Sequence, residues 1–364
     1  MIGTTTAPPG RAGRPTARGE PGGRGGVVTS PPFRALATVA TAAAAALTAC
    51  GGPHSGIAAP ASGAAEAIGG LWWILFWTCL VVFVVVLGGW TWALVRRRAS
   101  AGSVEPEGRS LFWAVIAGGV IPAVILAGLM LVTLRTSGRL SGAAARTDAM
   151  VVEVVGHQFW WEARYPAAGA VTANEIHVPA GQPVRLRLRS NDVIHSVWIP
   201  RLHGKLDLTP GRTTELLIRA DEPGEYRGFC AEFCGVQHAL MGLRIVAWPE
   251  PEFERWVQRM AAPAPPPEND EAVLGQAVFA RYDCHLCHRV RGAPHPEPVR
   301  DVGPDLTHLG TRASLGAVTL ENTSENLAAW IRDPHRFKPG VRMPATRMPE
   351  RELRALVRYL EGPR

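Results

Sequence analysis

The residues with the clearest chemistry in this sequence lie in two short cysteine-containing strings, far apart in the chain. The first string, Cys230-Ala-Glu-Phe-Cys-Gly-Val-Gln-His-Ala-Leu-Met241, places two thiols, an imidazole and a thioether within twelve residues. Thiolate and thioether sulfur select copper or zinc, whereas hard cations prefer carboxylate oxygen. A further imidazole, His195, belongs to a predicted strand upstream and could reach the same loop. The string therefore predicts a site for a soft metal ion.

Three other interpretations compete with a copper site that uses both thiols. In an oxidising compartment Cys230 and Cys234 could form a disulfide, but His238 and Met241 would then have no role. Two cysteines and two histidines could hold a structural zinc ion, against which Met241 argues. A mononuclear blue-copper site needs one cysteine rather than two.

The second string, Cys284-His-Leu-Cys-His288, has the spacing of covalent c-type haem attachment. In that chemistry the thiols of Cys284 and Cys287 bond to the porphyrin vinyl groups, and the adjacent imidazole of His288 becomes the proximal iron ligand. A zinc half-site would need a second Cys/His pair at suitable spacing, and a redox dithiol is the other alternative. We therefore predict one covalent haem c.

The other axial ligand of this haem should be a thioether or an imidazole well downstream, because His/Met coordination raises the potential of electron carriers. Two methionines, Met343 and Met348, each precede a proline in the expected region. The lead-in Lys338-Pro-Gly resembles the methionine loop of class I cytochromes c. We therefore expect Met343 to be the ligand, with Met348 as the alternative.

Two soluble domains are expected to position these residues. Over 148–260, about eight short segments show the period-two alternation of strands, as where Val184, Leu186 and Leu188 alternate with arginines, which suggests a sandwich or Greek-key barrel. A Pro-rich linker follows at 261–270. Residues 271–364 carry helical periodicity and predict a small all-α domain.

The first part of the chain predicts export and membrane insertion. Residues 1–49 resemble a bacterial lipoprotein signal peptide, and Cys50 follows its expected cleavage site, where such a cysteine is lipidated. Residues 50–70 read as a tether. Two uncharged apolar segments, 71–95 and 111–134, are each long enough to cross a membrane.

Charge distribution indicates the orientation and argues against a nucleic-acid partner. The segment between the two apolar spans begins Arg96-Arg97-Arg98, which by the positive-inside rule makes it cytoplasmic and both soluble domains periplasmic. The net charge is +7, from 38 basic and 31 acidic residues. Residues 1–49 supply +4 of this charge (five Arg against one Glu), so the remainder offers no phosphate-binding surface.

The first cysteine string resembles the dinuclear copper A site of cytochrome c oxidase subunit II. In that family two bridging thiolates hold two copper ions, each ion takes one histidine, and a methionine sulfur and a glutamate carbonyl complete the set. The resemblance implies the ligands His195, Cys230, Glu232, Cys234, His238 and Met241. It also implies that the carboxylate of Glu232 helps to hold a magnesium ion at the boundary with subunit I.

Two other segments resemble regions through which proteins of that family dock the electron donor or receive its electrons. Gly156-His-Gln-Phe-Trp-Trp161 resembles an aromatic segment whose first Trp lies on the entry route from soluble cytochrome c, which implies such a role for Phe159 and Trp160. The phenylalanine at 159 departs from the family and puts the usual route in doubt; these rings could simply be core. Asp207 lies in a segment resembling a donor-docking loop, and it could equally be a solvated turn residue.

Over nearly all of 71–361 the chain resembles subunit II of a haem–copper oxidase with a fused cytochrome c domain. This implies a multidomain fold in the bacterial plasma membrane: a two-helix transmembrane hairpin, an all-β cupredoxin-like Greek-key sandwich or barrel, and a small all-α cytochrome c domain. The implied partners are subunit I with haem a and copper B, subunit III, and a periplasmic cytochrome c or quinol–cytochrome c reductase as donor.

The resemblance implies a function in respiration. Electrons would pass from the donor through haem c to copper A and on to haem a, where oxygen is reduced to water with proton translocation. The alternatives are a membrane-anchored copper and haem electron shuttle without an oxidase partner, and the copper A subunit of a nitric oxide reductase.

Overall fold

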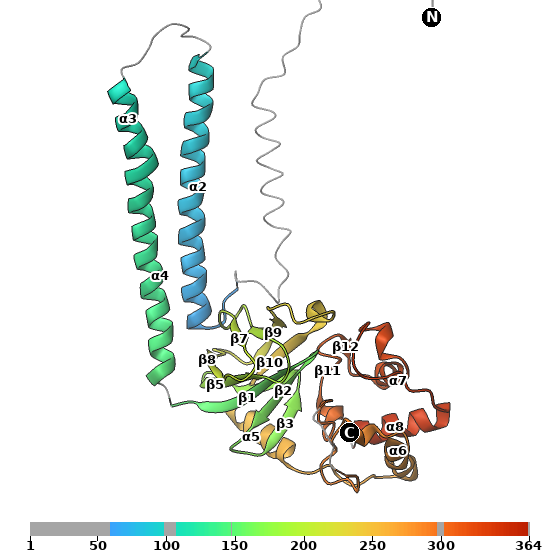
Figure 1. The fold of residues 1–364 in the computed structure, drawn as a ribbon. Coiled ribbons are helices and arrows are strands. Elements are labelled where there is room, and N and C mark those ends of the chain that lie inside the picture. Colours follow the sequence, from blue (N-terminus) through green and yellow to red (C-terminus); the bar gives the residue numbers. More distant parts are fainter. Residues whose placement is uncertain (1–58, 98–106, 147, 297–301, 363–364) are drawn as a thin grey trace, which may run out of the picture. The chain divides into compact units, whose positions relative to one another are not determined.

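The structure is a computed structural model that describes residues 59–97, 107–146, 148–296 and 302–362 (Figure 1). Two apolar helical segments and two soluble domains lie within these residues. The signal peptide expected at 1–49 and the lipidation site expected at Cys50 lie outside them, as does most of the loop between the two apolar segments.

Two long apolar helical segments precede the soluble domains and pack along each other (Figure 1). Helix α2 spans Gly63–Arg97, and the second segment runs through α3 (Glu107–Val115), a π-helical turn (Ile116–Val120) and α4 (Ile121–Arg146). Both are long and apolar enough to cross a membrane. The two segments expected to span a membrane are therefore helical.

The local structure of these helices differs from the sequence expectation in two places. Helix α2 begins inside the segment expected to be a tether, because the hydroxyl of Ser62 caps its first turn by accepting a hydrogen bond from the backbone N–H of Ala65 (3.0 Å). The second helix changes to π-helical geometry directly before Pro122. A wider turn at this place is consistent with the backbone N–H that proline lacks.

Residues 150–248 form a sandwich of two five-stranded sheets. One sheet has the order β3-β2-β1-β5-β8 and the other β4-β10-β9-β6-β7, and each contains one parallel pair, β1 with β5 and β4 with β10. The strands are β1 (Met150–His157), β2 (Trp160–Tyr165), β3 (Ala170–Ala173), β4 (Glu175–Pro179), β5 (Pro183–Ser190), β6 (His195–Trp198), β7 (Leu206–Leu208), β8 (Thr214–Arg219), β9 (Gly224–Cys230) and β10 (Gly242–Trp248).

The alternation seen in the sequence decides which face of β5 is buried. Leu186 and Leu188 have no exposed surface, whereas Arg185 pairs with Glu215 of the neighbouring strand at 3.0 Å. The period-two pattern is therefore confirmed: one face of β5 is buried and the other faces solvent. Strands β3 and β7 are too short to show such an alternation, which is why the sequence did not indicate them.

Helix α5 (Glu250–Ala261) closes the sandwich by burying Phe253, Trp256 and Met260 against its core. The chain then enters a smaller domain with its own core. Its elements are α6 (Asp270–Arg281), a hairpin of β11 (Ser314–Leu315) and β12 (Leu320–Glu321), α7 (Ser324–Arg332), α8 (Glu350–Glu361) and short 3-10 turns at 284–286, 309–311 and 334–336. The expected all-α domain is thus confirmed, with a two-residue-strand hairpin added.

Helices α6 and α8 cross in close contact at Gly275. A Cβ atom at this position would lie 2.0 Å from the backbone oxygen of Ala355, so no other residue fits without separating the helices. The last helix contributes Leu353, Leu356 and Leu360 to the core beneath this crossing. The two terminal helices of the domain are therefore held together by backbone contact at a glycine.

Gly275→Ala is expected to destabilise the C-terminal domain by about 1–3 kcal/mol or more, because the added methyl group meets backbone rather than a movable side chain. The measurement is thermal unfolding of the purified chain followed through this domain. Val273→Ala is the control, since Val273 is 53% exposed on the same helix. Equal midpoints for the two variants would contradict the close crossing.

Candidate metal centre and cofactor cavity

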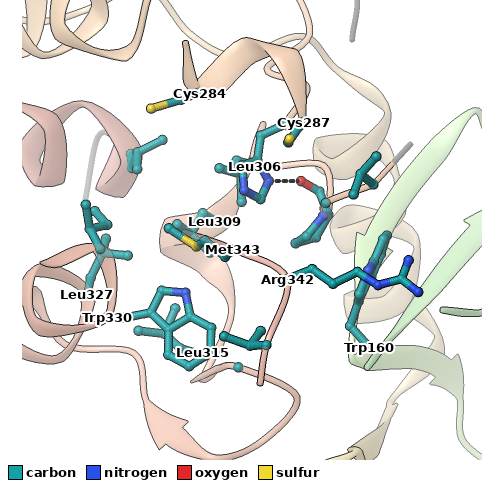
Figure 2. Close-up of a pocket in the computed structure, with 18 of the residues that line it drawn as sticks. Trp160, Cys284, Cys287, Leu306, Leu309, Leu315, Leu327, Trp330, Arg342 and Met343 are labelled. Atoms are coloured by element: carbon teal, nitrogen blue, oxygen red, sulfur yellow. Dashed lines mark hydrogen bonds between the residues drawn. The ribbon is translucent and has the colours of Figure 1, made fainter. Parts of the chain in front are cut away.

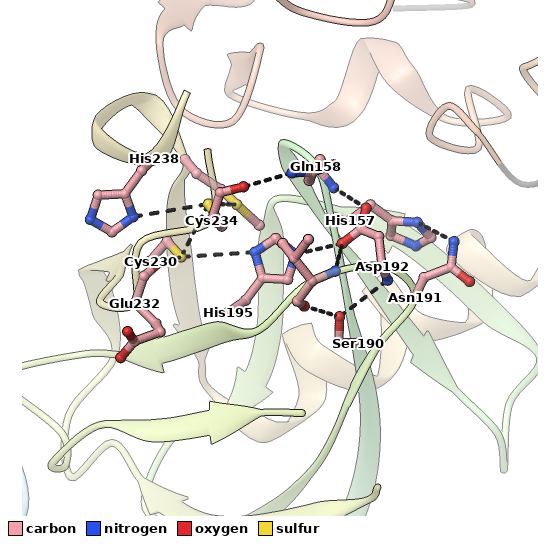
Figure 3. Close-up of polar contacts among 12 residues, drawn as sticks. His157, Gln158, Ser190, Asn191, Asp192, His195, Cys230, Glu232, Cys234 and His238 are labelled. Atoms are coloured by element: carbon pink, nitrogen blue, oxygen red, sulfur yellow. Dashed lines mark hydrogen bonds and ion pairs between the residues drawn. The ribbon is translucent and has the colours of Figure 1, made fainter. Parts of the chain in front are cut away.

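The six residues expected to hold a metal pair lie close together, and Figure 3 labels all of them except Met241, whose sulfur contacts that of Cys234. His195 begins β6 and Cys230 ends β9, and these two strands pair antiparallel. The chain then turns through Cys234 and a 3-10 turn at His238–Leu240 before Met241 leads into β10. Because β10 pairs with β9, the two ends of the Cys230–Met241 loop are held side by side.

The distances within this group describe a compact sulfur and nitrogen cluster. The Sγ atoms of Cys230 and Cys234 are 3.8 Å apart. The Nδ1 atom of His195 lies 3.9 Å from the first sulfur, and Nδ1 of His238 lies 3.9 Å from the second. The Sδ atom of Met241 is 3.8 Å from Cys234, and the carbonyl oxygen of Glu232 is 3.2 Å from Cys230. The two cysteine sulfur atoms thus face each other, and each lies close to the ring nitrogen of one histidine.

The two thiols are free and do not form a disulfide in this structure. Both are buried, and their separation of 3.8 Å is far beyond the S–S bond length of about 2.05 Å. The contact with Cys234 lowers the pKa of the Cys230 thiol, and the same contact raises that of Cys234. Cysteine binds metal as the thiolate, so both Cys230 and Cys234 would have to be deprotonated to hold a metal ion here.

Asp192 orients one of the expected ligands. Its Oδ1 atom lies 2.8 Å from Nε2 of His195, and its Oδ2 atom accepts a hydrogen bond from the backbone N–H of Gln158 at 2.7 Å. Burial lowers the pKa of His195, but the hydrogen bonds to Asp192 and Cys230 outweigh burial and leave that pKa above its usual value. A carboxylate behind a ligating histidine fixes which ring nitrogen faces the metal.

Gln158 also contacts the Cys230–Met241 loop directly, because its Nε2 atom donates a hydrogen bond to the carbonyl oxygen of Cys234 at 2.6 Å (Figure 3). Sequence analysis did not identify Gln158 or Asp192 as members of this site. Only Gln158 had a signal, since it lies inside the aromatic segment that begins at Gly156.

The other acidic residues considered for this region lie on the surface. The carboxylate of Glu232 points away from the thiols toward Lys205, at 3.5 Å, while its backbone carbonyl faces Cys230. Asp207 is half-exposed, and its Oδ1 atom lies 3.9 Å from the same lysine. The structure brings neither carboxylate into the sulfur cluster.

The second cysteine string opens into a cavity of about 220 Å³ in the C-terminal domain (Figure 2). Cys284, Cys287 and His288 line it, and both thiols are free. The Nδ1 atom of His288 lies 2.8 Å from the carbonyl oxygen of Pro304, which leaves Nε2 as the nitrogen available to a ligand. A side chain at Gly303 would meet the ring of His288 at 2.5 Å, so the Gly-Pro turn fits closely beneath the imidazole.

Met343 lies across the same cavity from the cysteine string. Figure 2 shows its thioether and the two thiols arranged around one space, with Trp330 and Leu315 completing the wall. Met348 packs against the domain core and is not among the cavity-lining residues. Of the two methionines that precede a proline, Met343 therefore lines the cavity and Met348 does not.

The cavity contains buried polar atoms without partners. Arg312 is 8% exposed and lines the cavity, and its Nε atom has no hydrogen-bond partner. Nε1 of Trp160, which also lines the cavity, is likewise buried without a partner. Buried polar groups are normally satisfied, so these two N–H groups each have room for a hydrogen-bond acceptor. No sequence pattern marked Arg312, because a single arginine in a loop has no distinguishing spacing.

The wall of this cavity includes part of the sandwich. Gln158 and Phe159 of the β1–β2 turn and Trp160 at the start of β2 line it together with residues of the C-terminal domain. Phe159 is 8% exposed and its ring packs near Gly235 of the Cys230–Met241 loop. The aromatic segment therefore lies between the cavity and the sulfur cluster rather than on an open surface.

Comparisons with known proteins point to one family for both domains. A family model described as the periplasmic domain of cytochrome c oxidase subunit II matches residues 168–247, and a model described as cytochrome c matches residues 272–362. The first match covers the sandwich from β3 to β10, and the second covers the helical domain, in the order in which the chain contains them.

Several curated proteins named cytochrome c oxidase subunit 2 are similar to the chain. The relative from Bacillus sp. strain PS3 is 32% identical over 280 residues, which are 73% of this chain and 78% of the relative. The relative from Alkalihalophilus pseudofirmus is 39% identical over 59% of this chain and 61% of its own length. The Bacillus subtilis relative is 35% identical over 59% of this chain and 62% of its own length. For the latter two, the match spans less than two thirds of the relative.

Proposed function

The chain belongs to the cytochrome c oxidase subunit II family and carries a fused C-terminal cytochrome c domain, and from this premise we propose that it relays electrons within a respiratory oxidase. It is a membrane-anchored protein with a periplasmic domain. The proposed direction is from a periplasmic cytochrome c, or from quinol–cytochrome c reductase, through this chain to haem a of subunit I. Oxygen reduction and proton translocation would take place in subunit I, and subunit III would complete the complex.

The observation that carries this proposal is the placement of two sites on either side of one short segment. Phe159 packs near Gly235 of the Cys230–Met241 loop and also lines the cavity of the cytochrome domain. When bound, a covalent haem c and a copper pair would each supply one-electron chemistry at these places. Residues 158–160 line the cavity and Phe159 also packs near the Cys230–Met241 loop, so both groups would be held next to this segment.

The residues present fit a copper A centre. His195, Cys230, Cys234, His238, Met241 and the carbonyl of Glu232 offer two facing thiols, two imidazoles, a thioether and a carbonyl in one cluster. Both sulfurs are buried, so they are shielded from solvent and from other oxidants. The role of Asp192 is to hold His195 with Nδ1 toward the sulfurs.

The residues of the cavity likewise fit haem c. Cys284 and Cys287 would form the two thioether bonds, His288 would be the proximal ligand and Met343 the distal one. The carbonyl of Pro304 keeps the imidazole turned toward the cavity. The unpartnered nitrogen of Arg312 would meet the acidic groups of the porphyrin.

The position of Phe159 suggests why this chain lacks the usual tryptophan. Its ring is buried between the two sites and is not available to a separate protein that docks on the surface. Electrons would therefore enter through the fused cytochrome domain, with Phe159 and Trp160 at the crossing. Asp207, exposed and remote from the cavity wall, would at most assist docking of the external donor.

Other parts of the proposal concern the membrane and subunit I. The two apolar helices would form a hairpin with its arginine-containing loop on the cytoplasmic side, so that both soluble domains face the periplasm. Removal of residues 1–49 would leave Cys50 as a lipidated N-terminus. The exposed carboxylate of Glu232 would be available to a magnesium ion at the boundary with subunit I.

The full chain, co-purified with its partner subunits from membranes, is expected to contain one covalent haem c and a copper pair per chain. Copper and haem quantification together with EPR spectroscopy checks this content, because a mixed-valence pair has a spectrum unlike that of a single cupric ion. A single copper ion, or a disulfide between Cys230 and Cys234, would overturn the proposal.

The same preparation separates the alternatives. Oxygen consumption with a stoichiometric haem a subunit supports the oxidase. Nitric oxide consumption instead would assign the chain to a nitric oxide reductase, and the lack of any haem subunit would leave an electron shuttle.

A further inference from the structure

A buried lysine lies where the cytochrome domain meets the Cys230–Met241 loop. Lys338 is 1% exposed, whereas Lys205, the other lysine of the chain, has a side chain that is 50% exposed. Burying an ammonium group is costly unless its hydrogen bonds are fully replaced. The position of Lys338 therefore depends on what its three donors contact.

The three N–H donors of Lys338 are matched by three backbone carbonyl groups. Nζ donates to the oxygen of Phe159 at 3.1 Å, to that of Leu240 at 2.9 Å and to that of Gly316 at 3.1 Å. An ammonium group has three donors, and all are used here. An uncharged side chain of similar length would leave these carbonyls without this donor.

Each of the three carbonyl groups belongs to a wall of one of the two sites. Leu240 directly precedes Met241, so its carbonyl lies at the end of the Cys230–Met241 loop. Phe159 lies between the loop and the cavity, and Gly316 lines the cavity from the β11–β12 hairpin. The ammonium group thus ties the sandwich to the cytochrome domain at the point where the two sites approach each other.

The residues that follow Lys338, up to Met343, approach the Cys230–Met241 loop. Gln237 donates to the carbonyl of Pro339. A Cβ atom on Gly340 would lie 2.9 Å from Val236, and the backbone there adopts a φ of +85°, which favours glycine. Arg342 donates to Oε1 of Gln158 at 2.5 Å. The Lys338–Met343 loop, which ends at the expected axial ligand, therefore contacts the Cys230–Met241 loop at Pro339 and Gly340 and the β1–β2 turn at Arg342.

A second contact fixes the same two domains elsewhere. The carboxylate of Glu175, on β4 of the sandwich, is 2% exposed and accepts hydrogen bonds from the hydroxyl of Ser314 (2.6 Å) and the backbone N–H of Ala313 (3.1 Å). A tether alone would leave such groups in water. The two anchors, one cationic and one anionic, set the orientation of the domains and not only their distance.

We propose that Lys338 is a positioning residue that holds the Lys338–Met343 loop against the Cys230–Met241 loop. The cytochrome domain would then transfer electrons from a fixed position and not as a mobile tethered domain. This inference rests on the proposed function, because it assumes that the two sites hold haem c and copper A. Lys338 lines the cavity, and its ammonium group would act on both sites through the three backbone carbonyls that it holds.

Acylation of the lysines in the unaltered full chain tests the fixed position. The purified full chain, carrying its haem and copper but separated from subunit I, is treated with an amine-reactive acetylating reagent, and modification at each lysine is followed by peptide mass spectrometry. Lys338 is expected to react at least about tenfold more slowly than Lys205, because reagent reaches it only when the domains separate. Burial lowers the pKa of Lys338 to about 8, so slow reaction would report exclusion of reagent and not the positive charge. Equal rates would overturn the proposal.

Lys338→Met tests the positioning role itself. The variant is expected to keep the haem c absorption spectrum and the copper-pair EPR spectrum of the unaltered chain. The rate of haem-to-copper electron transfer after photoreduction should fall at least about tenfold, because the buried carbonyls lose their hydrogen-bond donor. Hydrogen exchange of the segment 312–320 should rise in parallel. The control is Arg332→Met, which also removes one cation from the cytochrome domain but breaks only a surface pair with Glu350.

The outcomes separate this inference from the proposed function. A chain that lacks the copper-pair spectrum contradicts the proposed function, whatever its lysines do. Intact spectra with an unchanged transfer rate in Lys338→Met overturn the role of Lys338 alone. The acylation measurement uses no substitution, so a variant that fails to fold leaves the inference open to contradiction.

Discussion

Cys234→Ser is expected to abolish the copper pair and to reduce electron transfer to subunit I by at least about 100-fold. The thiol of Cys234 contacts three other expected ligands, namely Cys230, His238 and Met241, at 3.8–3.9 Å. A serine hydroxyl is a hard and weakly acidic donor that cannot bridge two soft ions. Loss of an outer partner of a metal ligand already costs about 10–100-fold, so loss of a bridging ligand should cost more. Copper content and the EPR spectrum of the purified complex are the measurements.

The chain supplies a matched control for this substitution in Cys79. This cysteine is free and exposed on the apolar helix α2, far in sequence from either site, so Cys79→Ser should retain the full copper content. Haem c should remain attached in both variants, because its cysteines lie in the other domain. A mixed-valence copper pair that persists in Cys234→Ser would contradict the ligand set.

Met343→Ala is expected to lower the reduction potential of haem c by on the order of 100 mV or more and to remove the absorption band of methionine–iron coordination. A thioether ligand stabilises the ferrous state, and axial ligands tune haem potentials over about 0.8 V. Met343 lines the cavity opposite Cys284 and Cys287, so its loss opens the distal side of the iron to water or to another base. A redox titration followed by optical spectroscopy measures the change.

Met348→Ala provides the comparison, since Met348 is a neighbouring methionine before a proline that packs against the core instead of lining the cavity. The potential and the band should stay unchanged in this variant. The reverse pattern, with loss in Met348→Ala and retention in Met343→Ala, would show that the distal ligand had been assigned to the wrong methionine.

Part of the fold and of both sites depends on residues that are close in sequence. The thiols of Cys230 and Cys234 and the pair Cys284 and Cys287 are examples, since their spacing alone limits the chemistry they can perform. The alternation along β5 and the apolar length of α2 likewise follow from period and composition. Such features could be predicted because they involve residues within one turn, strand or helix.

The choice between sites that share a motif depended on the fold. The sequence allowed a disulfide between Cys230 and Cys234, but in the structure the two sulfurs are 3.8 Å apart and each lies 3.9 Å from its own imidazole. The pairing of β6 with β9 brings His195 to Cys230, and the loop between β9 and β10 places His238 near Cys234. Similarly, Met343 and Met348 each precede a proline, and only the path of the loop places one of them in the cavity.

The contact between the domains could not be predicted from the sequence at all. Lys338 reaches the carbonyl of Phe159 across 179 residues, and Glu175 reaches Ser314 across 139. Their partners include backbone groups, which every residue possesses, so no residue type at a given spacing signals such a bond. The sequence by itself therefore determined the two cysteine motifs and the kinds of ligand atoms that they offer. The tertiary structure alone decided how near the two sites lie, because burial of a lysine or a glutamate against a distant backbone depends on how the whole chain packs.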